Sequence, residues 1–300
     1  MKSIILGMVL TILTFNGIVA QTPLWEGKGR IAISSDGNEH DHDDWAATPL
    51  SLALLSAANL QEELVVYTYS DHVWGSNQEH PTSPLGLTAY EQMRESALAG
   101  QKWFGFDNTK FICAVDNAEV AYNSLSGAIN ASTADDPLII IAAGPMQVVG
   151  EAIHRAEVSK RQYVTLISHS NWNNNHSDKP YKEFWDTHSG WTFQEIKDAF
   201  SNNEGGNLKA IRITDQNGGK DYDGLKASME QFDWVKTSEA RNSKAYKPGA
   251  WDWLYKRLKT CIKKGDIDAS DAGMVVYLLT GIEKTSVQMA KDIMENPVVK

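Results

Sequence analysis

Cysteine is scarce in this sequence of 300 residues. Its two cysteines, Cys113 and Cys261, stand in apolar contexts of a predicted strand and a predicted helix. A buried free thiol is common in such contexts, so we expect both cysteines to be reduced and buried. An exported protein permits a disulfide, but two isolated cysteines do not predict one.

Long hydrophobic runs are also few. Residues 4–13 form one, after Lys2 and before small residues that end at Ala20. This order is typical of a secretory signal peptide, so we expect residues 1–20 to be removed and residues 21–300 to be exported, either periplasmic or secreted. The run is shorter than the ~20 residues that a bilayer span needs, and no second run follows, so we expect no membrane partner.

Positively charged residues are fewer than negatively charged ones. Lysine and arginine number 28 against 38 aspartates and glutamates, which gives a net charge of −10. This balance disfavours a nucleic-acid polymer as partner and suits a small-molecule nucleoside or saccharide. A homo-oligomer is compatible with the sequence. Linkers and repeats are absent too, so we expect a single domain over residues 21–300.

Apolar segments alternate with helical patterns along this domain. The predicted strands are Arg30 to Ser34, Leu64 to Tyr69, Lys110 to Val115, Pro137 to Ala142, Tyr163 to Ser168 and Leu208 to Ile213. The predicted helices are Trp45 to Ala58, Ser83 to Trp103, Asn117 to Asn130, Met146 to Val158, Thr192 to Phe200 and Ala272 to Leu279. The pattern predicts an α/β fold, an open, mostly parallel doubly wound sheet flanked by helices.

Ligands of such sheets bind beyond the carboxyl ends of the strands. Four predicted strands end in polar sequences, which begin at Ser35, Ser70, Ala143 and His169. We expect these four loops to converge on one crevice.

The first of these loops is acidic. It holds five carboxylates in the nine residues from Asp36 to Asp44. Carboxylates this close repel one another unless a cation binds, and oxygen ligands suit Ca²⁺ or Mg²⁺, while His40 and His42 leave Zn²⁺ open. The alternative is a solvated turn in which Asp43 or Asp44 caps the next helix.

A second acidic cluster, residues 266–271, precedes the helix predicted from Ala272. Helix capping by Asp268 or Ser270 would explain it without any function.

The order of these segments resembles the inosine-uridine preferring nucleoside hydrolase superfamily. That family has a strand followed by an Asp-Pro-Gly-x-Asp-Asp loop, a later strand ending in Gly-Pro-Leu-Thr-Asn, and a late His-Asp pair at a helix start. Here the same order is Asp36 with Asp43-Asp44, then Gly144-Pro145-Met146-Gln147-Val148, then Ser270-Asp271. The resemblance spans the mature chain and implies the family's fold and a divergent, exported member.

The resemblance also implies a ligand set. By position, Asp36, Asp44 and Asp271 match the family's metal-ligating carboxylates, and a main-chain carbonyl near Met146 or Gln147 matches a further ligand. Ca²⁺ is the ion expected, ahead of Mg²⁺ and Zn²⁺. Asp36 would also take a proton from the attacking water, which a cation makes more acidic.

Sugar binding is implied at other positions. Asp43 would hold sugar hydroxyls, as would the amides Asn171, Asn173 and Asn174, whose side chains both donate and accept hydrogen bonds. Glu183 and Trp185 match a Glu-Phe-Asn segment of the family, with Trp185 replacing the last residue. An asparagine-rich run can equally be a simple turn.

Several positions depart from the family pattern. The loop between Asp36 and Asp43 is three residues longer, Ser34 replaces an aspartate, and Gln147-Val148 replaces Thr-Asn. Ser270 stands where the family often has the histidine that protonates a leaving base. These departures leave the metal site better supported than nucleoside specificity.

Histidines near the predicted crevice are candidates for the missing general acid. His72 is our expectation, and His80, His176 and His188 are alternatives without an identifying spacing.

Tryptophan is abundant, with ten residues. We expect Trp45, Trp74, Trp172, Trp185 and Trp191 in or near the crevice, where a ring can stack on a base or sugar. Trp251 and Trp253 have helical spacing and are expected in the core.

The leading functional hypothesis is a Ca²⁺-dependent hydrolase of glycosyl bonds, resembling nucleoside N-ribohydrolases. One alternative keeps the fold and metal but cleaves O-glycosides of polysaccharide-derived oligosaccharides. Another is a non-catalytic, metal-stabilised carbohydrate-binding protein.

Overall fold

The centre of the fold is a parallel sheet. The structure, a computed structural model, describes residues 22–37, 42–74, 86–176, 190–262 and 265–299. Six strands lie in the order β3-β2-β1-β4-β5-β6. They are β1 (Arg30–Ser35), β2 (Leu64–Tyr69), β3 (Lys110–Cys113), β4 (Leu138–Ala143), β5 (Val164–Ser168) and β6 (Lys209–Arg212). The predicted doubly wound α/β fold is confirmed.

Both faces of the sheet are buried, which explains why its strands are continuously apolar. Along β1, Ile31 and Ile33 belong to one hydrophobic core and Ala32 to the other. Ile139 and Ile140 of β4 divide between the two cores in the same way. Successive side chains of a strand point to opposite faces, so each central strand supplies both cores.

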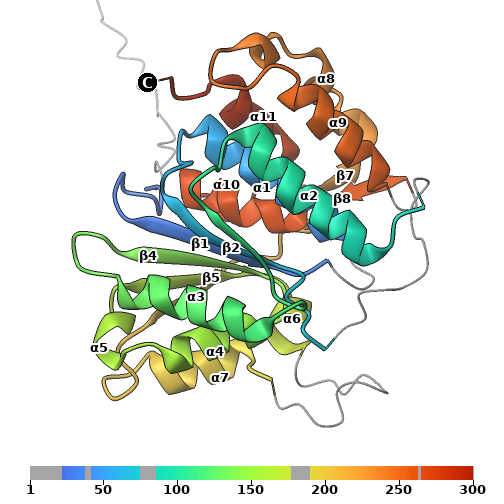
Figure 1. Cartoon of the computed structure of the whole chain (residues 1–300). Helices are drawn as coiled ribbons and strands as arrows, with labels where there is room; N and C mark the ends of the chain where they lie inside the picture. The colour runs from blue at the N-terminus through green and yellow to red at the C-terminus, as the bar shows by residue number, and fades with distance from the viewer. Residues whose placement is uncertain (1–21, 38–41, 75–85, 177–189, 263–264, 300) are drawn as a thin grey trace, which may run out of the picture.

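Helices cover the two faces (Figure 1). One layer contains α1 (His42–Ala57), α2 (Ala89–Phe104), α9 (Ala250–Thr260), α10 (Gly273–Thr280) and α11 (Val287–Glu295). The other contains α3 (Ala118–Asn130), α4 (Gln147–Arg155), α5 (Val158–Arg161) and α7 (Phe193–Phe200). Short elements fill the connections, namely α6 (Asn171–Asn175), α8 (Trp234–Thr237), η2 (Met229–Phe232), η3 (Glu239–Asn242), η4 (Ser270–Ala272) and the antiparallel pair β7 (Lys226–Ser228) and β8 (Asp266–Asp268).

Two predicted helices differ from the observed ones. The helix expected from Ser83 begins at Ala89, because the Thr88 side chain accepts the Glu91 amide and Glu91 bonds back in a capping box. The helix expected over 146–158 is divided, because Ala156 adopts extended backbone between α4 and α5.

The predictions for cysteine and for the helical tryptophans are confirmed. Cys113 and Cys261 are buried free thiols. Trp251 is buried and Trp253 packs against the same core.

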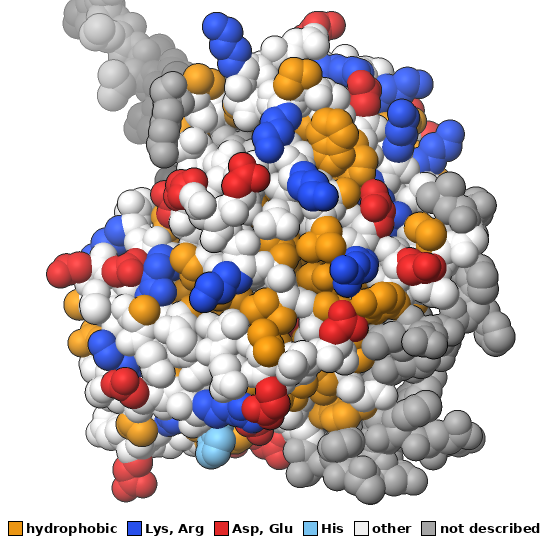
Figure 2. Space-filling model, in the orientation of Figure 1, with side chains coloured by type: hydrophobic (Ala, Val, Ile, Leu, Met, Phe, Trp, Pro, Cys, Tyr) orange, Lys and Arg blue, Asp and Glu red, His pale blue; other side chains and the backbone are white. Residues whose placement is uncertain are grey.

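Surface features bear on partners. Among the residues that the structure describes, no helix has the length and apolar character needed to cross a bilayer. On the face shown in Figure 2, basic and acidic side chains are interspersed with apolar ones.

Candidate functional site

The strand ends of β1 and β4 form the centre of the site. In the sheet, β1 has β2 as one neighbour and β4 as the other, so the strand order reverses between β1 and β4. The carboxyl ends of β1 and β4 are therefore the topological switch point, where ligands bind in such folds. The Asp36 amide donates to the Ala143 carbonyl at 3.1 Å, and the Ser70 amide donates to the Asp36 carbonyl at 3.2 Å. Asp36 is therefore held between two neighbouring strand ends.

Gly144 permits this close approach. A Cβ atom at Gly144 would lie 3.0 Å from both the amide nitrogen and the Cβ of Asp36. Those are tighter than ordinary van der Waals contacts, so any side chain here would push Asp36 away.

Three carboxylates from opposite ends of the chain meet beside Asp36. Asp43 and Asp44 lie in the first turn of α1, and Asp271 lies in η4, which packs against α1. One oxygen from each of these three carboxylates lies within 4.8 Å of the others. The helix dipole explains acidic residues at the start of α1, but it does not explain the convergence of Asp271 on them.

Crowding of the carboxylates perturbs Asp44 strongly. Burial raises the pKa of Asp44 well above its usual range, and the charge and hydrogen bond of Asp36 raise it further, followed by the charges of Asp271 and Asp43. The Ser35 hydroxyl donates to Asp44 Oδ1. A cation among these groups would relieve the repulsion that raises this pKa.

Two donors fix the orientation of Asp271. The His169 Nε2 atom lies 2.6 Å from Asp271 Oδ1, and the Asn173 amide nitrogen lies 3.1 Å from the same oxygen. With Oδ1 engaged twice, Oδ2 is the oxygen left to face a ligand. His169 and Asn173 therefore act on Asp271 rather than as ligands themselves.

His169 lies between two carboxylates. Burial alone would lower its pKa, but the charge of Asp271 and the hydrogen bond of Asp215 raise the pKa of His169 to about 9. The Gln216 amide, however, faces His169 Nδ1 at 3.2 Å and can donate only to a neutral ring. A cation beside Asp271 would offset the charge that favours protonation, so His169 would then be neutral and accept the Gln216 amide.

These groups surround a cavity of about 220 Å³. Its lining residues are Asp36, Asp43, His169, Ser170, Asn171, Trp172, Asn173, Asp215, Asn217, Ser270 and Asp271. The structure thus brings together the predicted residues Asp36, Asp43, Asn171, Asn173 and Asp271, with Asp44 buried beneath them.

Other predicted residues lie elsewhere. The Met146 carbonyl accepts the Gly150 amide at 2.7 Å at the start of α4, and neither Met146 nor Gln147 lines the cavity. Gln147 instead accepts the Trp191 amide through its side-chain oxygen. Asn174 is buried and donates to the Ser170 and His169 carbonyls, so it stabilises the turn before α6.

Some predictions fall outside the described residues. These are Glu183, Trp185, His80 and His188, together with Glu39, His40 and Asp41 of the first loop.

His72 and His176 form a pair beside the cavity without lining it. Their Nε2 atoms are 3.3 Å apart, and both residues are buried. The role of His72 as general acid stays a prediction.

The tryptophans divide between the cavity and the core. Trp172 is 40 % exposed and lines the cavity, and the Trp74 ring lies 6.2 Å from the His72 ring. Trp45 is buried and donates to the Gly37 carbonyl, and Trp191 packs against His154 and Phe200, so these two are not in the crevice.

The site residues His169 and Asp215 were not among the sequence predictions for binding or catalysis. His169 directly follows β5, so the strand-end rule could have assigned it. Asp215 stands three residues beyond β6, a strand end that the sequence prediction did not consider.

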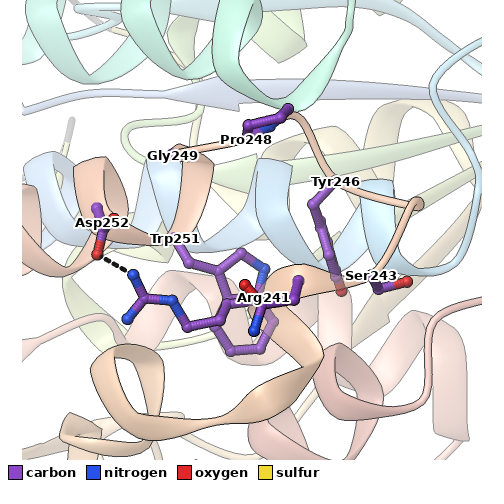
Figure 3. Close-up of a pocket in the computed structure, with 8 residues that line it drawn as sticks. Arg241, Ser243, Tyr246, Pro248, Gly249, Trp251 and Asp252 are labelled. Carbon is purple, nitrogen blue, oxygen red and sulfur yellow. Dashed lines mark hydrogen bonds and ion pairs between the residues drawn. The ribbon is translucent and has the colours of Figure 1, made fainter.

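A second cavity, of about 270 Å³, lies near η3 and the start of α9 (Figure 3). At its edge Arg241 donates to Asp252 at 2.6 Å and to the Lys236 carbonyl. The guanidinium of Arg241 is therefore already neutralised. Among the described residues, this second cavity shares no lining residue with the carboxylate cavity.

Comparison with known proteins gives one relative. No family model matches the chain, and no solved structure matches it. The chain is 33 % identical over 286 residues to the uncharacterized protein P22 of Formosa agariphila, and the match covers 92 % of this chain and 94 % of that protein. The chain therefore belongs to the same family as the uncharacterized protein P22 of Formosa agariphila.

Proposed function

We propose that this protein is an exported, Ca²⁺-dependent hydrolase of glycosyl bonds that resembles nucleoside hydrolases. One observation carries the proposal: the carboxylates of Asp43, Asp44 and Asp271, from distant parts of the sequence, lie together beside Asp36 at the switch point of the sheet. The cavity beside them also presents amide side chains suited to a sugar.

The donor set fits a hard cation. Each candidate ligand is a carboxylate, and Ca²⁺ accepts several oxygen ligands in flexible geometry, whereas Mg²⁺ demands a stricter octahedron. Zn²⁺ would favour an imidazole nitrogen. Within the described part of the chain, His169 is the one histidine that lines the cavity, and it directs its Nε2 atom to Asp271 instead.

The residues of the cavity would supply a base, groups that hold sugar hydroxyls, and negative charge near the anomeric carbon. A bound Ca²⁺ would supply positive charge that makes a nearby water more acidic. Asp36 accepts the proton, while Asp43 and the Asn171 and Asn173 amides hold sugar hydroxyls. The negative charge of the carboxylates favours an oxocarbenium-like centre at the anomeric carbon.

The second candidate is hydrolysis of O-glycosides from polysaccharide fragments. Trp172 favours it, because this half-exposed ring lines the cavity and can stack on a sugar face. Ser270, which lines the cavity where the resemblance implies a histidine for protonating a base, points in the same direction.

A substrate panel separates these candidates. Purified protein is incubated with inosine and uridine, and separately with oligosaccharides, each with EDTA or with excess Ca²⁺. Released base supports N-glycosyl hydrolysis, and reducing sugar alone supports the second candidate. Binding without turnover of any member would favour a carbohydrate-binding protein and overturn the proposal.

The Asp36→Asn variant tests whether Asp36 is the base. We expect it to remove turnover, because an amide cannot accept the proton. Asp221→Asn is the control. Asp221 is exposed, pairs with Lys284 and does not line the cavity, so this variant should leave turnover unchanged.

A further inference from the structure

The pair of histidines beside the cavity is a second cluster of metal-ligating groups. His72 follows β2, and His176 stands at the end of α6. Both are buried, at 2 % and 7 % exposure, and they present the same atom, Nε2, to each other at 3.3 Å.

This separation allows both nitrogens to bind one metal ion. With the usual zinc to imidazole distance of about 2.0–2.1 Å, two nitrogens 3.3 Å apart subtend an angle of roughly 104–111° at the ion. That is close to the tetrahedral angle. We propose that His72 and His176 bind a divalent transition-metal ion through their Nε2 atoms, at a site distinct from the carboxylate cavity.

The surroundings suit such an ion. The Trp172 ring packs on His176 with centroids 3.8 Å apart, and the Trp74 and Trp172 rings each lie 6.2 Å from His72. An aromatic shell of this kind limits water access and holds the imidazoles in place.

The local charge also favours a cation. Trp172 lines the cavity that contains the carboxylates of Asp36, Asp43, Asp215 and Asp271. Among the described residues, its lining includes no lysine or arginine. A divalent ion near this cavity therefore meets an attractive field.

The two sites would prefer different ions. Imidazole nitrogens suit Zn²⁺, Co²⁺ and Ni²⁺, whereas carboxylates suit Ca²⁺. The proposal is therefore independent of the Ca²⁺ site. It also removes Nε2 of His72 from proton transfer while the ion is bound, because the ion occupies the lone pair of that nitrogen.

The test is a metal titration that isolates the histidine pair. Protein freed of metal with EDTA and dialysed is kept in excess Ca²⁺, so that the carboxylates are filled. Zn²⁺ is then titrated by calorimetry, and Co²⁺ by the visible absorption of its tetrahedral complexes. We expect one Zn²⁺ per chain.

Variants identify the ligands. His72→Gln and His176→Gln each keep an N–H group for a hydrogen bond across the pair but remove a good ligand. Each should weaken Zn²⁺ binding by more than the roughly 10-fold that losing an outer partner costs. Thermal melts establish that the variants are folded.

Two controls complete the design. His154→Gln, at an exposed histidine of α4, should leave Zn²⁺ affinity unchanged. Asp271→Asn should weaken Ca²⁺ binding far more than Zn²⁺ binding, because it removes a Ca²⁺ ligand but only one distant charge from the histidine pair. Absence of stoichiometric Zn²⁺ binding, or native Zn²⁺ affinity in both glutamine variants, would show that the pair is only hydrogen-bonded and overturn the proposal.

Discussion

Asp271 is the residue on which the site depends, and its orientation is set by its neighbours. His169 and Asn173 both donate to its Oδ1 atom, at 2.6 and 3.1 Å. Resemblance predicted Asp271 itself, but the sequence could not predict that His169, just after β5, and Asn173, on α6, donate to it, because tertiary packing brings these groups together.

We predict that His169→Ala weakens Ca²⁺ affinity by about 10- to 100-fold, since Asp271 loses its closest donor. His169→Gln retains an N–H group of similar reach and should restore most of the affinity. Calorimetric titration with Ca²⁺ measures both. If alanine binds Ca²⁺ as tightly as the native histidine, His169 does not position Asp271.

Cys113 gives a pH prediction away from the site. Burial raises the pKa of its thiol to about 12. Because the thiolate is the reactive form, alkylation by iodoacetamide should be slow at pH 8 and should accelerate as the pH rises toward that value. Mass spectrometry of the folded protein measures the rate, with urea-unfolded protein as the fast control. Equal rates in folded and unfolded protein at pH 8 would contradict this.

Among the elements, the sheet was the most predictable part. Its strands are buried on both faces, so each appears in the sequence as a continuous apolar run, and all six lie within two residues of their predicted bounds. The pair β7 and β8 was not predicted, because strands of three residues carry no periodic signal. The end of α4 was missed for a similar reason, since only the two residues Ala156 and Glu157 depart from helical backbone before α5.

The junction of β1 and β4 yields a prediction at this scale. Gly144→Ala places a methyl group 3.0 Å from Asp36, so we expect a loss of about 1–3 kcal/mol in unfolding free energy and weaker Ca²⁺ binding. Urea denaturation and calorimetry measure the two effects.

Gly127→Ala in α3 is the matched control. No atom lies within 4 Å of a Cβ atom at Gly127, and alanine favours helix more than glycine, so this variant should gain about 0.5–1 kcal/mol. Similar effects of the two substitutions would show that the contact with Asp36 is not restrictive.

At the scale of the whole molecule, Ca²⁺ should join the start of the fold to its end. Asp36 directly follows the first strand and Asp44 lies in the first helix, whereas Asp271 belongs to η4 near the carboxyl terminus. The sequence alone left this first loop equally explicable as a solvated turn. The structure adds the geometry that brings Asp271 to it.

We therefore predict that Ca²⁺ stabilises the entire domain. At a concentration of about 100 times Kd, a ligand that binds only the folded state contributes about 2.7 kcal/mol, which corresponds to roughly 4–5 °C in Tm for a chain of this size. Calorimetric melts with Ca²⁺ and with EDTA measure the shift. A shift that persists in Asp271→Asn would place the ion elsewhere.

The most direct test of the account is a Ca²⁺ binding isotherm of EDTA-treated protein, measured by calorimetry beside Asp271→Asn and Asp221→Asn. We predict one Ca²⁺ per chain, about 10-fold or more weaker binding in Asp271→Asn, and native affinity in Asp221→Asn. Absence of Ca²⁺ binding by the native protein, or the same affinity in all three proteins, would contradict it.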